Sequence, residues 1–136
     1  MLKISDAASL ALHTMVFLAA HTEHLVSNKE IAVKLGVSEA HLSKVLQRLA
    51  KVGLVHSTRG PKGGFSLGKN SQEITLLEVY ETIEGPIITC QCLLDQQICA
   101  KTHCILGPIL HTINAQVKEY FGKTNLYQLI GAYACC

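Results

Sequence analysis

The stretch that decides the fold is residues 27–67, SNKEIAVKLGVSEAHLSKVLQRLAKVGLVHSTRGPKGGFSL. It begins with a capping box, S-x-x-E, in which Ser27 and Glu30 satisfy backbone N–H groups at a helix start. The first helix ends at Gly36, a residue suited to the left-handed conformation beyond a helix. Ser38 then caps a second helix. Its apolar stripe consists of Leu42, Val45, Leu46 and Leu49. Two helices joined by a short turn that contains glycine indicate a helix-turn-helix.

The outward positions of the second helix are typical of a recognition helix, short or polar near the N-terminus and basic further on. After Gly53, residues 54–58 and 65–67 read as two strands around a basic, glycine-rich tip. A hairpin in this place is a wing that can reach a phosphate or the minor groove. We predict Ser38, Glu39, Ala40, His41 and Ser43 nearest to DNA bases. The other predicted DNA contacts are Lys44, Gln47, Arg48, Arg59, Gly60, Pro61 and Lys62.

This stretch has three other interpretations. Helix-turn-helix geometry also occurs in protein-interaction modules, and basic residues on a hairpin tip can serve only solubility. A phosphate-binding loop is excluded because no Gly-Lys-Ser/Thr follows the glycines and strands flank the tip on both sides. The net charge of +2 permits nucleic-acid binding without requiring it, so local placement of charge carries the argument.

The chain of 136 residues predicts one mainly α domain with a small β-wing, extended by a long dimerisation helix. We expect a winged helix-turn-helix domain over residues 1–85, a cysteine-rich loop over 86–103 and the dimerisation and last helices over 104–136. The first helix should be capped by Ser5 or Asp6 and run to about Thr22. A second capping box, Thr75 with Glu78, should open another helix. No long apolar run or signal-peptide pattern occurs, so a cytoplasmic protein without a membrane partner is expected.

The predicted dimerisation helix begins at Cys104. One face of it is a narrow apolar seam that a chain of this size does not fully bury, which indicates a homodimer. The seam consists of Leu106, Ile109, Leu110, Ile113, Val117, Tyr120 and Phe121. Thr124 or Asn125 should cap the last short helix.

Cysteines form the second candidate site. Six occur in the chain, and four have the spacing C-x-C-x6-C-x4-C: Cys90, Cys92, Cys99 and Cys104. In a reducing compartment this pattern favours a metal site, a cluster or redox chemistry over structural disulfides. Thiolates select iron–sulfur clusters and zinc, but the paired knuckles of structural zinc are missing. Buried apolar cysteine and a reversible disulfide remain alternatives. A cysteine nucleophile with His103 or His111 as base has no supporting cleft or oxyanion-hole signal, so no enzyme is expected.

Nearly the whole chain resembles the bacterial family of iron–sulfur and nitric-oxide regulators typified by IscR and NsrR. The resemblance rests on residues 8–12 (ASLAL), 36–42 (GVSEAHL), 46–55 (LQRLAKVGLV) and, above all, 59–69 (RGPKGGFSLGK). The cysteine loop before a long helix and residues 126–130 (LYQLI) complete it.

This resemblance implies a homodimeric winged-helix transcription factor on double-stranded DNA with a palindromic operator. It also implies a [2Fe–2S] or [4Fe–4S] cluster on Cys92, Cys99 and Cys104. The chain departs from the family pattern at the fourth ligand, because Gly107 and Ser9 stand where relatives offer histidine or aspartate. Candidates for that ligand are Cys90, His103 and Asp6. Some family members hold no cluster, so two functions stay open. One is a cluster-sensing repressor, and the other is a cluster-free regulator that responds to thiol oxidation, a metabolite or a partner protein.

Overall fold

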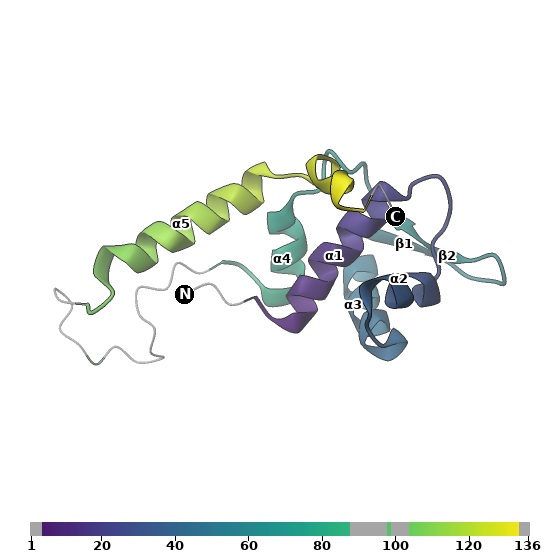
Figure 1. Ribbon diagram of the computed structural model, residues 1–136, viewed down its shortest axis with the longest axis horizontal. Helices are drawn as coiled ribbons and strands as arrows, with labels where there is room; N and C mark the ends of the chain where they lie inside the picture. The colour runs from purple at the N-terminus through teal and green to yellow at the C-terminus, as the bar shows by residue number, and fades with distance from the viewer. Residues whose placement is uncertain (1–3, 88–97, 99–103, 134–136) are drawn as a thin grey trace.

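The computed structural model describes residues 4–87, 98 and 104–133 (Figure 1). Its elements are α1 (Asp6–Ala20), α2 (Asn28–Leu35), α3 (Glu39–Lys51), β1 (Val55–Thr58), β2 (Gly64–Leu67), α4 (Leu76–Glu84), α5 (Gly107–Lys123) and the 3-10 helix η1 (Leu126–Ala132). The predicted mainly α fold with a small β-wing is confirmed. Within these described ranges, no helix is both long enough and apolar enough to span a membrane.

Local caps begin most of the helices. The side chains of Ser5, Ser27, Ser38 and Asn125 each accept a hydrogen bond from the backbone N–H three residues on. The capping box predicted at Ser27 forms in full, and α2 ends at Gly36 in the left-handed conformation with φ of 67°. Because these signals depend only on neighbours in the chain, the helix starts follow directly from the sequence.

The box predicted at Thr75 forms only in part. The Thr75 hydroxyl accepts from the Glu78 N–H, as expected. The Glu78 carboxylate instead pairs with the ammonium of Lys69, 2.7 Å away. A cation from the preceding loop thus binds the side chain that would otherwise have capped the helix start.

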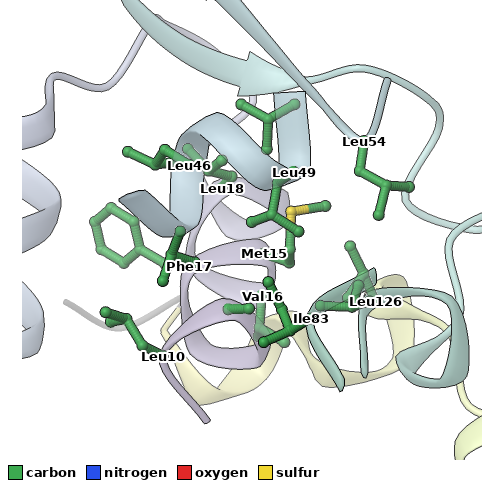
Figure 2. Packing of buried hydrophobic residues seen from close by; sticks show 14 of the residues in the cluster. Leu10, Met15, Val16, Phe17, Leu18, Leu46, Leu49, Leu54, Ile83 and Leu126 are labelled. Carbon is green, nitrogen blue, oxygen red and sulfur yellow. The ribbon is translucent and has the colours of Figure 1, made fainter. Parts of the chain in front are cut away.

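Helix α1 lies at the centre of the apolar core (Figure 2). Met15, Leu18 and their neighbours are buried around nearly the whole helix, as expected for a helix covered on all sides. Side chains from three other elements point toward α1 in Figure 2. They include Leu49 of α3, Ile83 of α4 and Leu126 of η1.

The wing is an antiparallel hairpin in which Val55 pairs with Leu67 and Thr58 with Gly64. It is attached to the body through an isolated bridge between Val26 and Phe65. At its base, a Cβ on Gly68 would lie 2.0 Å from the Gly53 carbonyl oxygen. Only glycine therefore permits this approach, and the hairpin is held in a fixed place beside α3.

Helix α5 begins at Gly107, three residues after the predicted start at Cys104. Pro108 occupies the first turn, where its missing N–H costs nothing, so the proline sets the helix start. Toward its end the helix packs against α4, and its beginning projects away from the body, so that the helix forms an arm (Figure 1). The predicted seam is divided, because Leu110 and Phe121 are buried whereas Ile109 and Tyr120 are each more than half exposed.

The end of the chain returns to the winged-helix body. The Leu76 N–H donates to the Thr124 carbonyl, and the Leu126 N–H donates to that of Ile74. Helix η1 then packs on α1, and the Leu126 side chain is fully buried. Residues 124–133 are therefore part of the core of the body as well as the continuation of α5.

Candidate nucleic-acid interface

The exposed face of α3 is the first part of the candidate interface. Leu42, Val45, Leu46 and Leu49 point into the core. On the opposite side Glu39, Ala40, Lys44, Gln47 and Arg48 are exposed, together with the cap residue Ser38. His41 and Ser43 are half-buried. The predicted outward face is thus formed mainly by Ala40, Lys44, Gln47 and Arg48, which succeed one another at helical spacing.

The tip of the wing is the second part. Arg59, Gly60, Pro61 and Lys62 are all exposed. In the part of the chain that the structure describes, the ion pairs join Glu23 with His24, Lys69 with Glu78 and Lys123 with Glu119. Arg59, Lys62 and Lys44 take part in none of these pairs. Their charges are consequently available to phosphate groups.

One predicted contact residue of α3, Ser43, is engaged within the protein. The side-chain amide of Asn28, at the start of α2, donates to the Ser43 hydroxyl at 2.5 Å. A longer contact of 3.5 Å joins the same amide to the Glu39 carbonyl. Asn28 therefore fixes the two helices of the motif to each other. In the sequence, Asn28 stands out only as a residue inside the capping box. No local pattern predicts that its side chain binds Ser43 of α3.

Arg48 is also engaged within the protein. Its Nη2 donates to the carbonyl oxygen of Ile83 in the last turn of α4, at 2.6 Å. The same end of α4 is joined to the start of α1 by a hydrogen bond from the Ser5 hydroxyl to the Glu84 carboxylate. Nearby, burial and then the charge of Glu84 raise the pKa of the Tyr80 phenol above its usual value.

Most of the predicted cluster site lies outside the described residues. This applies to Cys90, Cys92, Cys99 and His103. Cys104 lies just before α5 and is half-buried, and Asp6 is exposed at the start of α1. Across the described ranges, no three side chains of His, Cys, Asp or Glu come together as a metal-binding group. The thiol donors suit an iron–sulfur cluster chemically. The geometry of the ligands stays a prediction.

The comparisons with known proteins agree with this architecture. The family model "Rrf2: Iron-dependent Transcriptional regulator" matches residues 4–132. The regulator NsrR of Bacillus licheniformis is 33% identical over 132 residues, covering 94% of this chain and 90% of that protein. IscR of Pectobacterium atrosepticum is 25% identical over 130 residues, covering 95% and 79%.

Among solved structures, CymR of B. subtilis, described as the global cysteine regulator, is similar over 97% of this chain and 98% of its own. The TM-score is 0.81 and the sequence identity 33%. These relatives are transcriptional regulators rather than enzymes. The chain belongs to the Rrf2 family of transcriptional regulators.

Proposed function

We propose that this regulator is a cytoplasmic homodimer that reads a palindromic operator with α3 and the wing of each subunit. The observation that carries this proposal is the exposed stripe of α3 beside a wing tip whose cations have no acidic partner among the described residues. Bases would be read from Ser38, Ala40 and Gln47. Phosphates would be bound by Lys44 and by the wing, with Arg59 foremost.

The second subunit is proposed to pack on α5. This helix extends from the body with Ile109 and Tyr120 exposed, and a lone apolar arm of this kind is stabilised when another copy covers it. Two copies related by a twofold axis present two equivalent wings and two recognition helices. A twofold protein matches a palindromic site, with the half-sites one helical turn of DNA or a multiple apart.

The DNA-binding proposal is tested by the salt dependence of affinity. Each phosphate contact contributes about 0.9 to the slope of log K against log salt. Arg59→Ala removes one contact from each subunit, so the slope should fall by roughly 1.8 in a dimer. Lys123→Ala is the matched control, because that lysine lies at the end of α5 and pairs with Glu119. If Arg59→Ala binds with unchanged affinity and slope, the wing does not contact DNA.

We further propose that the regulator senses its signal through an iron–sulfur cluster. Cys92, Cys99 and Cys104 would hold the cluster, with Cys90, His103 or the partner copy's Asp6 as fourth ligand. Support comes from the spacing of the thiols and from the family description as iron-dependent. When bound, such a cluster supplies redox and nitric-oxide chemistry, and its loss would change the packing of the segment between α4 and α5. DNA affinity then responds only if the cluster favours one arrangement of the dimer over another.

An anaerobic visible absorption spectrum with iron and sulfide analysis tests this second proposal. The freshly purified protein should show charge-transfer bands with matching iron and sulfide. Cys99→Ala should lose them and stay folded, whereas Cys135→Ala, outside the predicted ligand set, should keep them. A colourless wild-type protein after reconstitution would contradict the presence of a cluster, and a coloured Cys99→Ala protein would contradict the ligand assignment.

The likeness to CymR favours a second candidate function, a cluster-free regulator that responds to thiol status. In this case the same cysteines would form a reversible disulfide. DNA affinity would change on treatment with a thiol oxidant and recover with a reductant, independently of iron. Cys99→Ser should abolish that response under the second candidate. An iron-free protein with no response to either reagent would exclude it.

A further inference from the structure

Arg48 lies on the recognition helix, but its guanidinium is directed to a helix end. Its Nη2 lies 2.6 Å from the carbonyl oxygen of Ile83, whose own side chain is buried. The last carbonyls of a helix have no partner within the helix and carry partial negative charge. Helix α4 has no basic residue in its last turn, where Glu81 and Glu84 occur instead. Arg48 therefore supplies from α3 the cation that the end of α4 lacks.

Among the described residues, side-chain hydrogen bonds to other elements hold α3 at two places along its length. Near its start, the Asn28 amide binds the Ser43 hydroxyl, and toward its end Arg48 binds α4. Between the two, Val45 and Leu46 are buried in the core. Apolar packing holds the helix against the body, while the two hydrogen bonds, being directional, restrict its rotation and tilt.

Small tilts matter at the DNA surface. From Arg48 to Ala40 the helix spans roughly 12 Å, eight residues at 1.5 Å each. A tilt of about 5° over this length displaces the base-reading residues by about 1 Å. Hydrogen bonds between nitrogen and oxygen occupy a range of only about 0.5 Å, so such a displacement breaks them.

We propose that Arg48 is a positioning residue that sets the orientation of α3 and thereby the choice of operator, and that it is not a phosphate contact. This inference rests on the proposed DNA-binding function. It reassigns a residue that sequence alone groups with the phosphate contacts. Both Lys44 and Arg48 are exposed and take part in none of the ion pairs of the described residues, but the Arg48 guanidinium donates to the Ile83 carbonyl. Lys44 therefore keeps the phosphate role.

The two roles predict different behaviour of Arg48→Met, which keeps the length of the side chain and removes its charge. Sequence-independent binding depends on phosphate contacts, whereas operator preference depends on base contacts. A positioning role predicts a loss of about tenfold in operator affinity, the scale of one base contact, with binding to random duplex and the salt slope unchanged. A phosphate role predicts a parallel loss on both duplexes and a slope lower by roughly 1.8 per dimer.

The experiment measures fluorescence anisotropy of the full-length dimer with an operator duplex and a random duplex across a salt series. Lys44→Met is the matched control and should lose slope on both duplexes. Arg48→Lys covers the case in which Arg48→Met does not fold, because lysine keeps the charge and lacks the planar fork. For Arg48→Lys, a reduced ratio of operator to random affinity supports the inference, and an unchanged ratio overturns it.

For Arg48→Met, an unchanged ratio also overturns the inference, whether or not the slope falls. Failure of the proposed function itself is a separate result. In that case the wild-type protein itself would show no preference for the operator duplex over the random duplex. This result would contradict the proposed DNA-binding function before any variant is compared.

Discussion

Replacing Leu126 by alanine should lower the free energy of unfolding by about 3 kcal/mol. The side chain is fully buried, at 0% exposure, where η1 packs on α1. Removing three carbon atoms forfeits about 2.4 kcal/mol of burial, at about 0.8 kcal/mol each. The cavity left in the core adds to this, and measured changes for buried leucines run from about 2.7 to 5.0 kcal/mol. The prediction tests whether the end of the chain is part of the winged-helix core.

Urea unfolding followed by circular dichroism at one fixed protein concentration provides the measurement, because a dimer's apparent stability depends on concentration. Leu129→Ala is the matched control, since this residue lies in the same 3-10 helix but is only partly buried. It should cost roughly half as much. If Leu126→Ala costs under about 1 kcal/mol, or no more than the control, η1 does not contribute to the core as described.

Two further changes probe the wing and an ionisable group of the core. Gly68→Ala should destabilise the protein by about 1–3 kcal/mol and weaken DNA binding, because the added Cβ would lie 2.0 Å from the Gly53 carbonyl oxygen. Gly131→Ala is the control, because that position has open space around it, and it should have little effect in the same kind of urea titration. Burial and the charge of Glu84 raise the pKa of the Tyr80 phenol in the folded protein. As the pH rises, this phenol therefore ionises in the unfolded chain before it ionises in the folded protein. The contribution of the Tyr80 phenol to the free energy of unfolding is full below a pH of about 10. This contribution is lost as the pH rises from there through the pKa of Tyr80 in the folded protein. Tyr80→Phe should therefore flatten the loss of stability in alkaline urea titrations, and an identical alkaline profile would contradict the assigned cause.

The parts of the fold that depend on neighbours in the chain were predictable. Ser27, Ser38 and Gly36 mark helix ends through local hydrogen bonds and backbone conformation, and the structure has them in these roles. Periodicity likewise identified which face of α3 is buried. The start of α5 was predicted at Cys104, three residues early, because apolar periodicity does not reveal where Pro108 sets the first turn.

What the sequence could not supply are the contacts between distant elements. Outward position on α3 makes Arg48 and Ser43 look like DNA contacts, yet their partners are Ile83, 35 residues away, and Asn28, 15 residues away. Nothing in the local pattern of either helix encodes such a pairing. The cysteine site is the opposite case, since spacing and resemblance support it while most of its residues lie outside the described ranges.

Selection of DNA by the full-length protein from a random duplex library is the measurement to make first. Two copies of α3 and of the wing, related by a twofold axis, should enrich an inverted repeat whose half-sites lie about 10 base pairs or a multiple apart. Arg59→Ala should enrich the same repeat with weaker binding, because phosphate contacts carry little sequence information. Enrichment of a single half-site or of no sequence at all would contradict a dimeric reader of palindromic DNA.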